Sequence, residues 1–266
     1  ELGEKSPMGY IVENWFLKKS LLEFCQQLPE DNLKIIDNSR VKSIQNNSST
    51  ATITTEKGDS YTAKLLIAAD GKFSSTRKNL GINTIDKNYN QTALTFGISH
   101  SESHNKLALE RFTPTGPFAV LPMHNKNESS IVWTVTNEQA KFFTKMNDAE
   151  ILFEIKKRMG NYLGEVKLID KIAPYPLILK YVNKYYSGRT VLIGDAAHGI
   201  HPIAGQGFNQ GVKDISKLYS LIIENRSLGL DIGEANMLDK YQQSARLDNH
   251  QMILATDFFN SIFSNN

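Results

Sequence analysis

The spacing of apolar residues changes abruptly between residues 189 and 222, and this change marks the most informative stretch of the chain. Residues 191–193 are consecutive aliphatic residues, a pattern typical of a short buried strand, and Gly194 and Asp195 follow them directly. After a stretch rich in glycine, apolar residues return at helical spacing, at Val212, Ile215, Leu218 and Ile222. The pattern predicts a strand, a glycine-rich loop and then a helix.

The same periodicities predict the other elements. Helical spacing occurs over residues 14–28, where Pro29 follows, over 148–159 and over 237–263. Alternating or continuous apolar runs between turn-forming residues predict strands. These strands are expected at residues 33–36, 40–45, 51–55, 61–67, 91–99, 107–112, 118–122, 130–136 and 166–179. Between residues 86 and 180 the predicted strands follow one another with few helices between them. This order suggests an antiparallel sheet inserted into an α/β unit.

Composition and charge exclude several classes of function. The chain has 266 residues, a net charge of +2 and 22% charged residues, so it lacks the basic surplus of a nucleic-acid-binding protein. Its single cysteine, Cys25, excludes an internal disulfide and a site with several cysteine ligands, which suits a reducing compartment. No apolar run approaches the ~18 residues of a membrane span, and no signal-peptide pattern opens the sequence.

The stretch after Asp195 has the residue types of a ligand-binding loop. Pro202, Gly205, Gly207 and Gly211 follow in quick succession, and glycines are costly in backbone entropy unless the backbone must turn tightly or approach something closely. A loop of this kind before a helix presents free N–H groups and the positive end of the helix dipole to an electron-rich ligand. Asp195 can accept hydrogen bonds from a hydroxylated ligand. The alternative is a helix start with an elaborate turn.

A second strand-end motif, LLIAADGKFSSTR, lies at residues 65–77. Asp70 and Gly71 follow a predicted buried strand, and Ser74 and Arg77 come next at helical spacing. Asp70 can accept hydrogen bonds, and Arg77 can hold the strand end by pairing with a carboxylate. The alternative is a strand-to-helix turn with a capping serine and a surface arginine.

The segment GDAAHGIHPIAGQGFNQGVKD, residues 194–214, resembles the second flavin motif of the aromatic-ring hydroxylases that carry FAD. Within that group it is most similar to the ubiquinone-biosynthesis monooxygenases. The resemblance implies that Asp195 holds the ribityl chain of FAD, that the loop from Pro202 to Gly207 packs along the isoalloxazine, and that a helix beginning near Asn209 points its N-terminus at the flavin. The Asp-Gly motif would face the same flavin. The candidate cofactor-binding residues are Asp70, Gly71, Arg77, Gly194, Asp195, Pro202, Gly205, Gln206, Gly207 and Asn209.

The resemblance also implies the fold. We expect an α/β protein with an α+β insert, that is, an FAD/NAD(P)-binding fold of the aromatic-hydroxylase type with an antiparallel-sheet substrate domain. Residues 1–85 and 181–266 would form the FAD-binding part, and residues 86–180 the substrate-side sheet. The strands that end at Asp70 and Asp195 should lie in one layer with their carboxyl ends together. A G-x-G-x-x-G loop, which grips the pyrophosphate of FAD in such folds, does not occur in the sequence, so the fold is expected to be incomplete at its N-terminus.

The implied reaction is the hydroxylation of a polyprenylated phenol ring in ubiquinone biosynthesis. NAD(P)H or another donor would reduce FAD, and the reduced flavin would activate O₂; no side chain is needed as a nucleophile, and no catalytic residue is assigned. The implied partners are the polyprenyl phenol and other ubiquinone-biosynthesis proteins, with a cytoplasmic location at the periphery of the inner membrane. Without the pyrophosphate loop, we expect this chain to lack FAD and activity and to self-associate through an uncovered surface.

Several alternatives stay open from the sequence. The chain could be a hydroxylase of a soluble aromatic compound, or a non-catalytic remnant that acts as a scaffold subunit in a biosynthetic complex. His198 and His201 form an H-x-x-H pair, but no further ligand stands near them at metal-binding spacing, so hydrogen bonds that position the loop are favoured over a metal site. An apolar pocket and an ordinary sheet core are both compatible with four aromatic residues of the insert: Phe96, Phe112, Phe118 and Trp133.

Overall fold

The computed structural model describes residues 7, 9–114, 116–199 and 206–263. The chain divides into two compact units, and strands β5 (Thr84–His100) and β10 (Ala173–Val182) belong partly to each. Unit 1 contains residues 1–36, 90–176 and 263–266, and unit 2 contains residues 37–89 and 177–262. The assignment of an FAD-binding part and a substrate-side part to such units stays a prediction.

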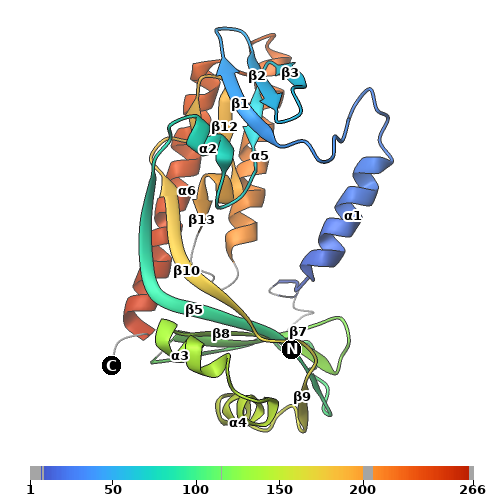
Figure 1. Cartoon of the computed structure of the whole chain (residues 1–266), viewed down its shortest axis with the longest axis vertical. Helices are drawn as coiled ribbons and strands as arrows, with labels where there is room; N and C mark the ends of the chain where they lie inside the picture. Colours follow the sequence, from blue (N-terminus) through green and yellow to red (C-terminus); the bar gives the residue numbers. More distant parts are fainter. Residues whose placement is uncertain (1–6, 8, 115, 200–205, 264–266) are drawn as a thin grey trace, which may run out of the picture. The chain divides into compact units, whose positions relative to one another are not determined.

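Unit 1 is built on an antiparallel sheet in the order β5–β8–β7–β6, with β9 beside the other edge of β5 (Figure 1). The strands are β6 (Leu109–Thr113), β7 (Gly116–Pro122), β8 (Glu128–Thr136) and β9 (Val166–Leu168). Two helices, α3 (Asn137–Phe143) and α4 (Asp148–Met159), place apolar side chains in the same core as the strands. The predicted antiparallel sheet between residues 86 and 180 is therefore present.

The four aromatic residues of the insert do not line an open pocket together. Phe96, Phe118 and Trp133 are buried in the core of unit 1, and Phe112 is 41% exposed. The guanidinium of Arg158 lies 4.2 Å from the ring centroid of Trp133, a cation–π contact that closes one side of this core. For the three buried residues, the sheet-core interpretation is the correct one.

Unit 2 contains two small three-stranded sheets. The first has the order β1–β2–β3 and is antiparallel: β1 (Val41–Asn46), β2 (Ala51–Thr55) and β3 (Ser60–Ala63). The second has the order β11–β12–β4: β11 (Tyr186–Ser187), β12 (Thr190–Leu192) and β4 (Leu66–Ala68). β4 and β12 run parallel, and Leu66, Ile67 and Ala68 pair with Thr190, Val191 and Leu192. A short strand β13 (His198–Gly199) pairs with the part of β10 in this unit.

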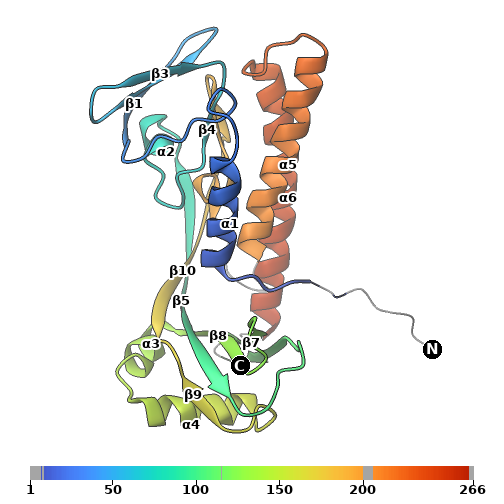
Figure 2. The ribbon, with the colours of Figure 1, turned by 90° about the vertical axis from the view of Figure 1, so that its right-hand side faces the viewer.

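Three α-helices complete the described part of unit 2. The short helix α2 (Ser75–Asn79) follows β4, and the long helices α5 (Gln206–Ser227) and α6 (Ala235–Phe263) run side by side in opposite directions (Figure 2). Lys217 on α5 joins the pair by an ion pair with Asp248 on α6, at 2.7 Å. Leu218 on α5 and Leu238 and Tyr241 on α6 pack in one buried cluster with Val191 and Leu192 of β12. The predicted helices in these regions are confirmed.

Several predicted boundaries are wrong. Residues 33–36 form no strand, and residues 61–67 form two strands, β3 and β4, which belong to different sheets. Residues 166–179 likewise divide into β9 and β10. Helix α5 begins at Gln206 rather than near Asn209, so Gly207 and Gly211 lie within the helix and not in the loop before it. Helix α1 (Asn14–Gln26) occurs as predicted but has no buried residue.

No described helix has the combination of length and apolar character that crossing a membrane would require.

Candidate active site

The turns that follow β4 and β12 lie at the same edge of one sheet. Because these strands are parallel neighbours in register, their carboxyl ends meet, and each is followed by a turn that carries an aspartate: Asp70 after β4 and Asp195 after β12. The carboxyl edge of parallel strands is where α/β proteins bind ligands. The predicted convergence of the two motifs, which are separated by more than a hundred residues in the sequence, is confirmed.

Arg77 joins the two turns directly. Its side chain is buried and donates one hydrogen bond to the carbonyl of Ala196 at 2.7 Å and another to the carbonyl of Lys72 at 2.9 Å. The sequence suggested a carboxylate partner, or else a surface arginine, and both suggestions are wrong. Backbone carbonyls take the role because the turns of the two motifs present them to the guanidinium. Arg77 therefore fixes one turn against the other.

Asp70 is largely occupied with its own turn. Its carboxylate accepts hydrogen bonds from the hydroxyl of Ser74 and from the backbone N–H of Thr76, the latter at 3.0 Å, while Ser74 caps α2 by accepting from the N–H of Arg77. Burial raises the pKa of Asp70, but the hydrogen bonds from Ser74 and Thr76 together outweigh it, so the pKa lies below its ordinary value. Asp70 is thus an anion at neutral pH that orders the start of α2.

Asp195 is in a different situation. It lies in a short 3₁₀ turn, Gly194–Ala196, and it is exposed while Ala196 and Ala197 are buried. Within the described part of the chain its carboxylate has no hydrogen-bond or ion-pair partner. An exposed and unpaired carboxylate at the carboxyl end of a parallel strand is available to a ligand that carries hydroxyl groups. The sequence predicts the same residue, Asp195, as the hydrogen-bond acceptor for a hydroxylated ligand.

One glycine in each of the two turns allows the backbone conformation there. Gly194 has a φ of +54° and Gly71 a φ of +80°, conformations that favour glycine. A Cβ added at Gly194 would lie 3.8 Å from the Cα of Gly211, so helix α5 passes close to the turn. A Cβ added at Gly207 would meet no described residue within 4 Å, so the described part of the chain leaves space beside the first turn of α5.

The remaining candidate residues are described only in part. Pro202 and Gly205 lie outside the described residues, as does His201, and of Gln206 only the backbone at the start of α5 is described. Asn209 is exposed on the first turn of α5. The described residues contain no cluster of three or more metal-ligating side chains. His198 hydrogen-bonds within its unit, to Asp214, as expected for a residue that positions the loop.

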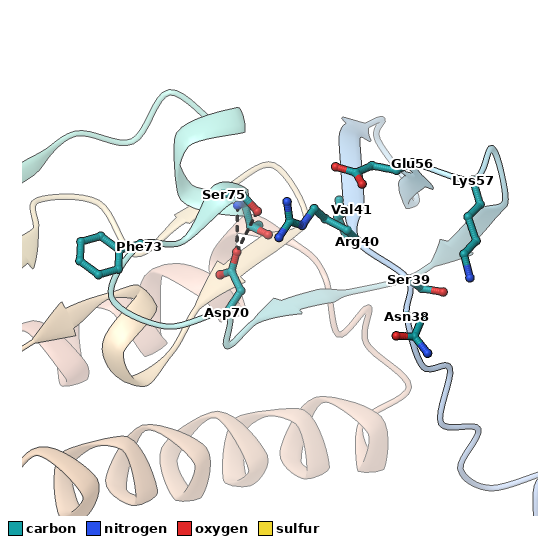
Figure 3. A pocket seen from close by; sticks show the side chains of 10 residues that line it. Asn38, Ser39, Arg40, Val41, Glu56, Lys57, Asp70, Phe73 and Ser75 are labelled. Carbon is teal, nitrogen blue, oxygen red and sulfur yellow. Dashed lines mark hydrogen bonds between the residues drawn. The ribbon is translucent and has the colours of Figure 1, made fainter. Parts of the chain in front are cut away.

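An open pocket of about 870 Å³ adjoins Asp70 (Figure 3). Its lining combines cations, hydroxyls and an exposed aromatic ring: Asn38, Ser39, Arg40, Val41, Glu56, Lys57, Asp70, Phe73, Ser75 and Thr76. In Figure 3 the guanidinium of Arg40 points from the start of β1 toward Ser75, and a hydrogen bond joins Ser75 to Asp70. Sequence reasoning missed Arg40 and Lys57, because single basic residues near a turn are common and carry no motif.

Comparison with protein families identifies one domain. The model of the FAD binding domain matches residues 11–256 of this chain. Ubiquinone hydroxylase UbiL of Rhodospirillum rubrum is 36% identical over 261 residues, which are 98% of this chain and 60% of that protein. 3-Demethoxyubiquinol 3-hydroxylase of Escherichia coli is 31% identical and is matched over 97% of this chain and 65% of its own length. The chain therefore spans less than two thirds of the length of these two relatives.

Solved structures show the same fold at low sequence identity. Pseudomonas aeruginosa PqsL in complex with 2-aminobenzoylacetate superposes with a TM-score of 0.81 at 18% identity, over 93% of this chain and 69% of PqsL. p-Nitrophenol 4-monooxygenase PnpA of Pseudomonas putida DLL-E4 gives a TM-score of 0.67 at 20% identity, over 94% of this chain and 67% of PnpA. The predicted fold class, a mixed α/β protein with antiparallel sheets, is confirmed.

Proposed function

Because the chain belongs to the FAD binding domain family, we propose that the intact protein is a flavin-dependent monooxygenase that hydroxylates a polyprenylated phenol ring in ubiquinone biosynthesis. The observation that carries the proposal is the parallel pairing of β4 with β12, which brings the turns of Asp70 and Asp195 to one sheet edge. The substrate class rests on the names of the relatives, ubiquinone hydroxylase and 3-demethoxyubiquinol 3-hydroxylase.

The described residues fit an FAD molecule at this edge. Asp195 is exposed and has no described partner, as a residue that accepts hydrogen bonds from ribityl hydroxyls must be. The described residues leave space beside Gly207 for a flat ring close to the N-terminus of α5, whose dipole stabilises negative charge. Arg40 and Lys57 in the pocket beside Asp70 suit the phosphates of a dinucleotide.

Bound FAD supplies the electron transfer and the activation of O₂. The chain supplies position: Arg77 holds the two turns together, Asp70 orders the start of α2, and Asp195 and Asn209 would bind the cofactor. Gly71 and Gly194 allow the turns, and Pro202, Gly205 and Gln206 complete the proposed cofactor-binding set. The reductant is NAD(P)H or another donor, and other ubiquinone-biosynthesis proteins are the proposed partners, at the cytoplasmic side of the inner membrane.

Replacement of Asp195 tests this proposal. In the intact protein, Asp195→Ala should lower the affinity for FAD roughly tenfold or more, because charge-assisted hydrogen bonds to the cofactor are lost. Gly207→Leu should weaken binding as well by filling the open space beside α5. The measurement is flavin absorbance of the purified protein, together with titration of the apoprotein with FAD.

Asp239→Ala is the matched control. Asp239 is also an exposed aspartate of unit 2, but it belongs to helix α6 and its carboxylate accepts a hydrogen bond from the Tyr186 hydroxyl at 2.7 Å. This variant should keep its flavin. An Asp195→Ala variant with wild-type flavin content and hydroxylase activity would show that Asp195 does not hold the cofactor.

A further inference from the structure

A single carboxylate oxygen on α5 holds both ends of the turn that contains Asp195. Oδ2 of Asp214 accepts a hydrogen bond from the backbone N–H of Gly194 at 2.8 Å, one residue before Asp195. The same atom lies 2.6 Å from Nε2 of His198, three residues after Asp195. The turn between these two points also has an internal bond, from the N–H of Ala197 to the carbonyl of Gly194. Asp195 is therefore presented from a loop tied to the helix on both sides.

This arrangement is deeply buried. Asp214 is 3% and His198 2% exposed, and the charge of Asp214 acts on two buried tyrosines, Tyr185 and Tyr241. Burial, with the negative charge of Asp214 as a smaller contribution, raises the pKa of Tyr185 to about 12. Placing a carboxylate and an imidazole in such surroundings costs free energy, and apolar residues of similar volume often stabilise a core better.

Within the described part of the chain, the pair also leaves one polar atom without a partner. Nδ1 of His198 is buried and has no hydrogen-bond partner among the described residues. Because a carboxylate can only accept, Nε2 of His198 donates to it, and the other ring nitrogen is the one left without a described partner. A buried polar atom without a partner adds to the cost, so the described contacts give no stability reason for the pair.

We propose that Asp214 and His198 form a clasp that sets the position of Asp195 for cofactor binding, with Asp214 as a positioning residue. The clasp fixes the backbone on both sides of Asp195, while Arg77 holds the same turn through the carbonyl of Ala196. A carboxylate that is already held where the ligand needs it loses less conformational entropy when the ligand binds. The inference rests on the proposed function, because the ligand that Asp195 meets is FAD.

The experiment compares Asp214→Ala with Asp231→Ala in the intact protein. Asp231 is a matched carboxylate: it also accepts from a glycine N–H, that of Gly233 at 2.9 Å, and from a buried basic side chain, Arg189, but it lies outside the turn. Two quantities are measured: the hydrogen-exchange rate of the Gly194 amide in the apoprotein, and the dissociation constant for FAD. Thermal unfolding reports the general loss of stability in each variant.

We expect Asp214→Ala to speed exchange at Gly194 and to weaken FAD binding, each by about ten- to a hundredfold, as expected for the loss of a hydrogen bond to a charged group. Asp231→Ala should lower the unfolding temperature and leave both quantities within about threefold of wild type, which is ~0.7 kcal/mol. Asp214→Asn, whose amide oxygen can still accept from Gly194, should restore most of the protection and affinity. If Asp214→Ala does not fold, Asp214→Asn and His198→Leu are compared instead, and His198→Leu should weaken FAD binding more.

Three outcomes would overturn the clasp. The first is a folded Asp214→Ala or His198→Leu variant with wild-type exchange at Gly194 and wild-type affinity. The second is an equal loss of affinity in Asp231→Ala, which would show that stability alone is responsible. The third is a wild-type protein that does not bind FAD, which the wild-type titration would show. In that case the proposed function fails, and the clasp fails with it.

Discussion

At the scale of single residues, Arg189 shows how one buried side chain holds several segments of unit 2. It is 5% exposed, and its guanidinium donates to the backbone carbonyls of Ser48 and Lys64 and to both oxygens of Asp231. The segments before β2, before β4 and before α6 therefore meet at the start of β12. A buried arginine with all of these acceptors is satisfied, whereas a missing acceptor would leave part of its charge uncompensated.

This ion pair predicts a specific dependence of stability on pH. The hydrogen bond from Arg189 and that from the N–H of Gly233 lower the pKa of Asp231 from 3.8 to about 2. Because the folded-state pKa lies below the unfolded-state value, the stabilisation is complete above about pH 4 and is lost as the pH falls toward 2. We expect Asp231→Asn to be less stable than wild type at pH 6 and the difference to shrink at pH 3 and below.

The measurement is thermal unfolding of both proteins across this pH range. Comparison with Asp231→Asn isolates this group, because the other carboxylates titrate in both proteins. A constant difference between pH 6 and pH 2 would contradict the assigned pKa.

At the scale of elements, helix α4 is specified by its own residues. Asn147 accepts a hydrogen bond from the N–H of Glu150, and the Glu150 side chain accepts from the N–H of Asn147, which is a complete capping box. Ile151, Ile155 and Met159 form its buried face, and Gly160, with a φ of +79°, ends it. The predicted and observed helices therefore coincide.

Loss of this cap gives an element-scale prediction. Asn147→Ala should lower the free energy of unfolding by about 0.5–2 kcal/mol, because the first turn of α4 loses a partner for one of its free N–H groups. Chemical denaturation followed by circular dichroism measures the change. Asn161→Ala, a replacement just beyond the other end of α4, is the control, and equal effects of the two substitutions would argue against a capping role.

At the scale of the whole molecule, two helices carry large apolar side chains that stay substantially exposed in the described part of the chain. On α5, Phe208, Val212, Ile215, Tyr219 and Ile223 recur at three- and four-residue spacing, and each is at least 44% exposed. On α1, Trp15 and Phe24 are each 62% exposed. Contiguous apolar surface of this kind favours association. Strand β4 adds an edge of its small sheet, which a further strand could pair with.

We therefore expect the 266-residue chain by itself to self-associate and to bind FAD weakly. The apolar stripe on α5 supplies the driving force, and the absence of a G-x-G-x-x-G loop from these residues removes the usual grip on the pyrophosphate. Light scattering and calorimetric titration with FAD measure the two properties. A monodisperse monomer that binds FAD with micromolar or tighter affinity would contradict both expectations.

Paired substitutions on α5 identify the surface responsible. Ile215→Lys with Tyr219→Lys should shift the chain toward the monomer, because the stripe loses two apolar side chains and gains two charges. Ser216→Lys with Ser220→Lys adds the same charge at neighbouring exposed positions of the helix and should leave association largely intact.

The sequence by itself determined the features that depend on neighbouring residues. Helical spacing specified α4, short apolar runs ending in Asp-Gly or Gly-Asp marked the strand ends before Asp70 and Asp195, and the GDAAHGIHPIAGQG segment indicated the family. The sequence also predicted that Asp70 and Asp195 lie at one edge of a sheet, because the strand before each of them ends in a turn typical of flavin sites. Helix α3 was missed, although its capping box, Thr136 with Gln139, was visible as a local signal.

Only the tertiary structure decided which distant groups meet. Arg77 finds the carbonyl of Ala196, 119 positions away, and no periodicity encodes such a partner. Residues 61–67 look like one strand because apolar spacing reports burial, but the chain changes sheets between Ala63 and Leu66, and the identity of the neighbouring strand decides that break. The pairing of His198 with Asp214 has the same origin: each residue is local to its own element, and their contact exists because α5 packs against the turn after β12.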